Sequence, residues 1–222
     1  MGPFDGIIEN IVGDGVDGLK EQYMKKGIIY VHGKGGSAEE ANHYKKLFPE
    51  CDIIGFDYKS VTPWDVKEEF VMFYDSFCKG YDSVEIIANS IGAFFMLCAL
   101  GDRNIERAYF ISPIVDMEKL ILDMMRRAGV TEENLQKQGT IKTDFGETLS
   151  WDYLSRVRNY SVSWNVPTMI LYGSNDLLQS TDTINSFAKK TGADVTVMKN
   201  GEHWFHTKEQ MEFLDNWLLN KS

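Results

Sequence analysis

The sequence predicts a doubly wound α/β fold, a three-layer sandwich in which helices cover both faces of a mostly parallel sheet. Six short apolar runs recur along the 222 residues, as expected of strands that are buried on both faces. Segments with helical signals separate these runs, and this alternation is the order that forms a parallel sheet. The chain is 43% apolar and 25% charged, so neither a disordered chain nor a collagen-like repeat fits. Its length suits one large domain.

The predicted strands are runs of four or five mainly apolar residues. In chain order they are Ile28–Val31, Ile53–Phe56, Val84–Ala88, Ala108–Ile111, Thr168–Tyr172 and Val195–Met198. Ligands of a doubly wound sheet bind at the carboxyl ends of its strands. The residues that directly follow these runs are therefore candidates for a functional site.

The first two connections carry clear helix signals. Ser37-Ala38-Glu39-Glu40 is a capping box, in which the serine and the glutamate satisfy free amides at a helix start, and Pro49 ends this helix. Thr62-Pro63 begins the next helix as an N-cap followed by proline at the first helical position. That helix ends at Gly80.

Three further helices are predicted from apolar periodicity and from the residues that cap them. They are Ile91–Leu100, ended by Gly101; Asn185–Lys190, ended by Gly192; and Thr207–Leu219, a capped amphipathic helix.

Two stretches depart from the pattern. Residues 1–26, with glycines among apolar residues, fit a helix, a poor hairpin or both. Residues 114–166 are an insertion of roughly fifty residues, too long for an ordinary loop. Its apolar residues fall in two groups, of which the first has the spacing of one helix face. The groups are Leu120, Ile121, Met124 and Met125, and Trp151, Tyr153 and Leu154. A lid over the strand ends and an ordinary packing subdomain both fit these signals.

The net charge and the cysteine content limit the partners and the cellular compartment that we expect for this protein. The net charge is −10 and the pI is about 4.9, so phosphate backbones and anionic lipid are repelled. Nucleic acid is not an expected partner. Cys51, Cys78 and Cys98 are odd in number and lack metal-like spacing, which favours buried thiols in a reducing compartment over disulfides. We therefore expect a cytoplasmic protein.

The sequence carries no clear signal for secretion or for insertion into a membrane. The N-terminus has no basic region followed by an apolar stretch, so no signal peptide is expected. The most membrane-like run, residues 84–100, is interrupted by Glu85, Asn89, Ser90 and Gly92 and is too short for a bilayer span. We expect no stable membrane anchoring.

The strongest catalytic signal is a serine between a predicted strand and a predicted helix. Ser90 has Ala88 and Gly92 two residues on either side, and a sharp strand-to-helix turn needs small neighbours at these positions. Such a turn lifts the hydroxyl above the sheet and directs the Ile91 amide toward an oxyanion. The alternative is a serine that only caps the helix.

A glycine-rich loop directly follows the first strand. It reads His32-Gly33-Lys34-Gly35-Gly36-Ser37, and its glycines allow backbone amides to turn inward. The Lys34 amide, alone or with that of Gly33, would complete an oxyanion hole with Ile91. The spacings of a Walker loop and of a dinucleotide-binding loop are both missing, so a phosphate loop is not favoured.

Two further strand ends carry an acid and a histidine. Asp176 closes the turn Gly173-Ser174-Asn175-Asp176, and His203 follows the last strand. An imidazole activates a serine by accepting its proton, and a carboxylate fixes the imidazole tautomer and stabilises its charged form. In isolation, Asp176 would be read as a solvated turn residue and His203 as a core or surface residue. The order serine, acid, histidine favours a catalytic triad.

From Gly27 to the C-terminus, these motifs resemble the α/β-hydrolase superfamily, whose triad has this chain order. The His-Gly-x-Gly-Gly loop and the Ala-x-Ser-x-Gly elbow are similar to those of small bacterial lipases and esterases. The Asn-Ser pair also resembles carbon–carbon bond hydrolases, and Ala88 in place of glycine leaves the subfamily open. The resemblance implies one α/β-hydrolase domain over residues 1–222. Residues 114–166 would be a helical cap or lid between the sixth and seventh strands.

The resemblance also implies roles for individual residues. The nucleophile would be Ser90, the acid Asp176, the base His203, and the oxyanion hole the amides of Lys34 and Ile91. We expect an acyl or ester substrate to contact Gly33, Trp64, Leu120, Met124 and Met125. The Lys34 side chain would meet a substrate carboxylate or point into solvent.

Three further residues are considered for roles in or around this site. Asp116 follows the strand that ends at Ile111 and is a rival acid, although the turn before Asp176 favours the latter. His206 is expected to be a cap or surface residue, and His32 to brace the oxyanion loop. No group of side chains has metal-ligand spacing, so neither a metal nor a cofactor is expected.

The expected activity is that of a serine hydrolase, which cleaves a small-molecule carboxylic ester or similar acyl compound through an acyl-enzyme. Carbon–carbon bond or amide hydrolysis on the same triad remains open. A non-catalytic ligand-binding member of the fold is a further alternative, although an intact triad counts against it. No sequence feature specifies an oligomeric state.

Overall fold

Six strands form the central sheet of the structure, a computed structural model that describes residues 24–221. The strand order is β2-β1-β3-β4-β7-β8, and each neighbouring pair runs parallel. The strands are β1 (Lys26–Val31), β2 (Cys51–Phe56), β3 (Ser83–Asn89), β4 (Arg107–Ile111), β7 (Thr168–Gly173) and β8 (Asp194–Met198). Every predicted strand is confirmed. The prediction for residues 1–26 lies outside the described residues up to position 23.

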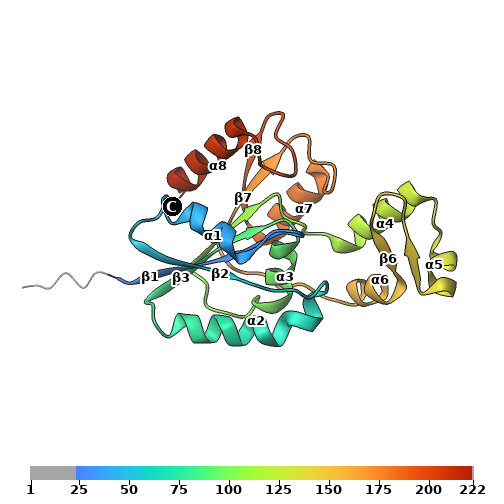
Figure 1. Cartoon of the computed structure of the whole chain (residues 1–222), viewed down its shortest axis with the longest axis horizontal. Coiled ribbons are helices and arrows are strands. Elements are labelled where there is room, and N and C mark those ends of the chain that lie inside the picture. Colours follow the sequence, from blue (N-terminus) through green and yellow to red (C-terminus); the bar gives the residue numbers. More distant parts are fainter. Residues whose placement is uncertain (1–23, 222) are drawn as a thin grey trace, which may run out of the picture.

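Helices cover both faces of this sheet, as the predicted three-layer fold requires (Figure 1). Successive side chains of a strand point to opposite faces: Ile29 and Val31 pack with α2, α3 and α7, while Ile28 and Tyr30 pack with α1 and α8. The helices, with the short 3₁₀ turn η1, are η1 (Ala38–Glu40), α1 (Ala41–Tyr44), α2 (Pro63–Cys78), α3 (Ile91–Ala99), α7 (Thr181–Thr191) and α8 (Lys208–Lys221).

The predicted helices are present, with two shifts at their ends. The first helix ends at Tyr44, well before Pro49. Helix α7 begins four residues earlier than predicted, because the Ser180 side chain caps it by accepting from the Thr183 amide at 3.2 Å.

The insertion forms a separate lobe beyond the carboxyl ends of the strands, at the right of Figure 1. Its elements are α4 (Met117–Ala128), α5 (Glu132–Gln138), β5 (Thr140–Lys142), β6 (Thr148–Ser150) and α6 (Trp151–Arg158). The two apolar groups of the sequence correspond to α4 and α6, whereas α5 and the antiparallel β5–β6 pair were not predicted. The lobe lies between the fourth and fifth strands of the main sheet, where the expectation counted a sixth and a seventh.

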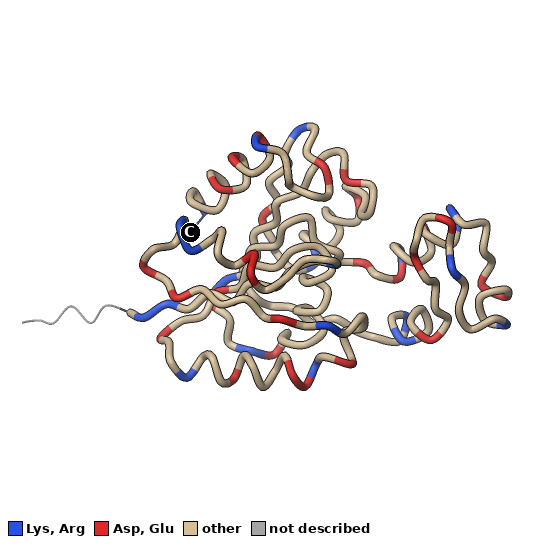
Figure 2. The backbone as a smooth tube through the Cα atoms, in the orientation of Figure 1, with Lys and Arg blue, Asp and Glu red and all other residues tan. Residues whose placement is uncertain are grey.

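Charged residues of both signs occur along the outer helices and the insertion (Figure 2). No helix within residues 24–221 is long and apolar enough to cross a membrane. All three cysteines are free thiols, but only Cys98 is buried, since Cys51 and Cys78 are half-buried. The prediction of buried thiols is therefore right for Cys98 alone, where burial raises the pKa to about 12.

Helix α3 begins in direct contact with the end of β1. A Cβ atom at Gly92 would lie 2.5 Å from the backbone oxygen of His32 and 2.8 Å from that of Val31. Both obstacles are main-chain atoms next to a central strand, so they cannot rotate away. The small residue that the sequence pattern requires two positions after Ser90 is thus explained by this close approach.

We predict that Gly92→Ala lowers the free energy of unfolding by about 1 to 3 kcal/mol, the usual cost of overpacking. Thermal and urea unfolding measure the change. Gly80→Ala is the matched control, because the nearest atom to a Cβ there is the Phe77 oxygen at 3.7 Å. Equal stability of the two variants would mean that α3 can move away from β1 without cost.

Candidate active site

Ser90 occupies the sharp turn between β3 and α3. Its φ of 53° and ψ of −120° belong to a backbone region that residues with a side chain rarely adopt. Neighbouring backbone holds this conformation: the Ser90 amide donates to Ile111 at 3.0 Å, and the Ser90 carbonyl accepts from Ala93 and Ile114, each at 3.1 Å. The strained turn is thereby fixed to the strand beside it and to the chain that leaves that strand.

A continuous chain of hydrogen bonds starts at the Ser90 hydroxyl. Its Oγ lies 2.7 Å from Nε2 of His203, and Nδ1 of His203 lies 2.7 Å from Oδ2 of Asp176. The Asp176 side chain is fully buried, whereas the His203 ring is 19% exposed. The second carboxylate oxygen of Asp176 accepts from the amides of Leu178 at 2.8 Å and Gln179 at 3.3 Å. Asp176 is therefore held on one side and directed at the histidine on the other.

The loops that carry Asp176 and His203 are joined by backbone contacts. The Asn175 amide donates to the Gly201 carbonyl at 2.8 Å, and the Asn200 amide donates to the Ser174 hydroxyl at 2.8 Å. At Gly173 an added Cβ would lie 2.4 Å from the Gly201 oxygen. The acid and the histidine are thus brought together by the pairing of β7 with β8 and by the close packing of the loops that follow.

The glycine-rich loop lies against the Ser90 turn. A Cβ on Gly33 would be 3.2 Å from Cβ of Ser90, so Gly33 adjoins this serine. Within residues 24–221, the backbone amides of Lys34 and Ile91 donate to no other main-chain carbonyl outside the regular elements. The Ile91 amide directly follows Ser90, and the Lys34 amide directly follows Gly33. Their role in an oxyanion hole stays a prediction.

His32 holds the start of this loop through its contacts with Tyr58. Its buried ring stacks on Tyr58, with centroids 4.1 Å apart, and the Tyr58 hydroxyl donates to the His32 carbonyl at 2.6 Å. Burial raises the pKa of the Tyr58 phenol, so its hydroxyl keeps the proton that it donates. The expectation that His32 braces the loop agrees with these contacts, and Tyr58 is a partner that the sequence analysis missed.

The Lys34 side chain is 67% exposed, which agrees with the expectation that it points into solvent, and it also has a partner that was not expected. Its ammonium pairs with the carboxylate of Glu147 at 2.5 Å, in the turn between β5 and β6. The pair joins the oxyanion loop to the insertion across 113 residues of sequence. The Lys34 ammonium therefore has a partner within the protein, the Glu147 carboxylate.

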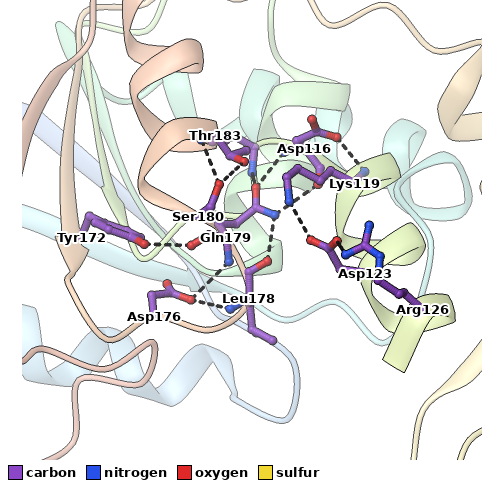
Figure 3. A network of polar contacts seen from close by, with 11 residues as sticks. Asp116, Lys119, Asp123, Arg126, Tyr172, Asp176, Leu178, Gln179, Ser180 and Thr183 are labelled. Atoms are coloured by element: carbon purple, nitrogen blue, oxygen red, sulfur yellow. Dashed lines mark hydrogen bonds and ion pairs between the residues drawn. The ribbon is translucent and has the colours of Figure 1, made fainter. Parts of the chain in front are cut away.

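The rival acid and the second histidine lie outside the hydrogen-bonded chain. Asp116 is the N-cap of α4, where its Oδ1 accepts from the Lys119 amide at 2.8 Å (Figure 3). His206 is an exposed residue whose Nδ1 lies 2.6 Å from the Trp204 carbonyl. Of the two carboxylates considered, Asp176 is the one that the fold brings to His203. No cluster of metal-binding side chains occurs in the part of the chain that the structure describes.

The apolar residues expected at the acyl site fall into different environments. Leu120 and Met125 are buried in the hydrophobic cluster that the insertion shares with one face of the main sheet, whereas Met124 is partly exposed. Trp64, at the start of α2, packs on Tyr153 of α6 with ring centroids 4.7 Å apart. Leu120 and Met125 are thus packing residues, the alternative left open for this segment, and Trp64 is a contact between the main domain and the insertion.

Sequence reasoning also missed the residues that follow the acid and the histidine. Leu177 is 95% exposed and Trp204 is 71% exposed, so two large apolar side chains stand in solvent on the triad loops. Gln179, by contrast, is almost completely buried. Its neighbours in sequence carry no periodicity or motif that would single it out.

Comparisons with known proteins identify the architecture. No family model matches the sequence, and no curated protein does so either. Est1E from Butyrivibrio proteoclasticus is similar in structure, with a TM-score of 0.69 and 17% identity, over 89% of this chain and 88% of that chain. Alpha/beta hydrolase domain-containing protein 10 from mouse has a TM-score of 0.67 and 15% identity, over 88% of this chain and 90% of that chain.

An esterase from Pyrococcus furiosus is a third similar structure. It has a TM-score of 0.59 and 17% identity, over 88% of this chain and 81% of that chain. Likeness at these identities concerns the fold, and it extends over most of both chains in every case. The main parallel sheet and the helices on its two faces agree with this likeness. The chain has the α/β-hydrolase fold.

Proposed function

We propose that this protein is a serine hydrolase that cleaves a carboxylic ester or a related acyl compound through an acyl-enzyme. The observation that carries the proposal is the chain of two 2.7 Å contacts from Ser90 through His203 to Asp176. A serine hydroxyl becomes a useful nucleophile when a neighbouring imidazole can take its proton. Similar structures that are named esterases also favour an ester substrate.

The proposed reaction has two halves. Ser90 Oγ attacks the substrate carbonyl while Nε2 of His203 accepts the hydroxyl proton, and the tetrahedral oxyanion is stabilised by the amides of Lys34 and Ile91. His203 then donates this proton to the departing alcohol, and the acyl group stays on Ser90. Water, deprotonated by His203, releases the acid and restores the serine. The buried Asp176 carboxylate stabilises the charged imidazole in both halves.

The surroundings of the triad favour an uncharged acyl group. Leu177 and Trp204 present apolar surface beside Asp176 and His203, and the net charge of −10 slows the approach of anionic substrates. A solved structure of Est1E contains ferulic acid, so a feruloyl ester belongs in a substrate panel beside aliphatic esters of graded chain length. We further propose a cytoplasmic location, on the free cysteines, and no nucleic-acid partner or stable membrane anchor.

Residues 114–166 are proposed to act as a cap within a single α/β-hydrolase domain. Two contacts beside the site support this role. Lys34 of the oxyanion loop pairs with Glu147, and Trp64 packs on Tyr153. On α4, Met124 is only partly buried, and we propose that it contacts the substrate.

Amide or carbon–carbon bond hydrolysis would use the same triad, and a ligand-binding protein would not use it at all. A fluorophosphonate probe separates the catalytic proposals from the last one, because only an activated serine labels rapidly. Rapid labelling at Ser90 supports a hydrolase, and a panel of esters, amides and β-diketones then identifies the bond. An unlabelled Ser90 would exclude the proposed mechanism.

Ser90→Ala should reduce hydrolysis of an activated ester by about 10⁴-fold or more, because it removes the nucleophile. The melting temperature should stay close to that of the wild type, since the change removes one partly exposed hydroxyl. Initial rates and melting curves are the two measurements. A variant that keeps more than about a tenth of the wild-type rate, far above what loss of a nucleophile permits, contradicts the assignment.

Asp176→Asn should lower turnover by about 10⁴-fold, as expected when the histidine loses its orienting carboxylate. Asp116→Asn is the matched control, because asparagine is an equally good N-cap and the side chain of Asp116 bonds the Lys119 amide. Turnover of the control should stay near the wild-type value. If Asp116→Asn were the more damaging change, the acid would have to be reassigned.

Met124→Ala should change the preferred ester chain length, with discrimination shifted by about 1 to 3 kcal/mol per methylene lost, and should lower the melting temperature little. Leu120→Ala is the contrasting variant, because loss of a buried leucine costs about 2 to 5 kcal/mol of stability. Specificity constants for short and long esters are measured beside melting curves. An unchanged chain-length profile in Met124→Ala would argue against the cap role of this helix face.

A further inference from the structure

One buried side chain joins the triad acid to the start of the insertion. Gln179 is 2% exposed and lies three residues after Asp176. Its Oε1 accepts from the amides of Val115 and Asp116, both at 3.0 Å. Its Nε2 donates to the carbonyls of Asp116 at 3.2 Å and Leu178 at 3.1 Å (Figure 3). A primary amide offers two acceptor positions and two donor hydrogens, and all four are used.

The main chain of Gln179 belongs to the turn that holds the acid. Its amide donates to Oδ1 of Asp176 at 3.3 Å, and its carbonyl accepts from the Tyr172 hydroxyl at 2.8 Å. The other oxygen of Asp176 faces His203. A movement of Gln179 therefore displaces one of the donors that fix the carboxylate.

The bonds of the Gln179 side chain reach the insertion at its root, residues 115–116, directly before α4. This segment leaves β4 and carries no sheet hydrogen bonds of its own, so its amides depend on the glutamine oxygen. A buried amide left without a partner destabilises the segment that carries it. Glutamine also adds no charge beside Asp176, in contrast to a glutamate of the same length.

We propose that Gln179 is a positioning residue, which holds the Asp176 carboxylate toward His203 by tying the acid turn to the root of the insertion. The triad acid and the insertion thereby share one support. The kinetic consequence rests on the proposed function, whereas the consequence for the hydrogen bond between Asp176 and His203 does not.

The test compares Gln179→Met with Thr168→Val. Methionine keeps the length of the side chain and removes all four hydrogen bonds. Thr168 is a matched control, because it is 3% exposed, lies at the opposite end of β7, and makes two buried hydrogen bonds, with Trp164 at 2.8 Å and Val166 at 2.7 Å. Each protein is measured by melting temperature, by the low-field proton resonance of the His203 Nδ1–H group, and by kcat and KM on an activated ester.

Both variants should melt at lower temperature than the wild type. Only Gln179→Met should broaden or move the His203 resonance, and only Gln179→Met should lower kcat, by up to about 10²-fold, the cost of a catalytic group displaced by about 1 Å. KM should stay unchanged, because Gln179 does not contact the substrate. Gln179→Asn keeps an uncharged amide on a shorter side chain and should show changes in the same direction, which provides the test if the methionine variant does not fold.

A Gln179→Met protein that melts early but keeps the wild-type resonance and kcat would overturn the proposal, since Gln179 would then only stabilise the fold. Failure of the proposed function has a different signature. The wild type would neither hydrolyse the ester nor react with the fluorophosphonate probe, and the His203 resonance of the variants would still decide whether Gln179 positions Asp176.

Discussion

The site of this protein depends on one constrained backbone, that of Ser90. Its positive φ is unfavourable for a residue with a side chain, and it persists because hydrogen bonds to Ile111, Ala93 and Ile114 hold it. The same bonds link β3, the start of α3 and the exit of β4. Gly92 then allows α3 to lie directly on the end of β1. The sheet thus holds the Ser90 backbone in its strained conformation and keeps the Ser90 hydroxyl at the carboxyl ends of the strands.

The remaining members of the site come to Ser90 through the order of the strands. β1, β4, β7 and β8 all end at the same edge because every pair is parallel, so their following loops meet there. The loops after β7 and β8 are joined by backbone contacts between Asn175 and Gly201. Asp176 is fully buried and His203 is partly open to solvent, which suits a carboxylate that stabilises charge and an imidazole that exchanges protons with a substrate.

Three of the contacts between the insertion and the main domain bear on this edge. The root is held by Gln179, the hairpin turn by the pair of Lys34 and Glu147, and α6 by the packing of Tyr153 on Trp64. These contacts differ in strength: the ion pair is exposed and weakened by salt, whereas the glutamine is buried. The lobe is therefore anchored firmly at its root and more loosely at its tip, an arrangement that suits a cap which must admit a substrate.

Local sequence rules account for the elements of the main domain and for the three residues proposed as the triad. Strand runs, caps and helix-ending glycines act over a few residues, so the six strands and their helices are readable without a structure. The three-residue strands β5 and β6 are too short to show periodicity, and they were missed together with α5. Burial likewise separated Leu120 and Met125 from Met124, although all three lie on one predicted helix face.

The sequence by itself therefore determined the fold class, Ser90 with its small neighbours, and an acid and a histidine in the right order. The turn before Asp176 favoured it over Asp116 in the sequence, but only the tertiary structure showed which carboxylate lies at His203. It alone assigned the ammonium of Lys34 to Glu147 and the side chain of Gln179 to residues 115–116. The physical reason is the same in each case: these partners are 27 to 113 residues apart, and no local pattern encodes which distant backbone or side chain will fill a hydrogen bond.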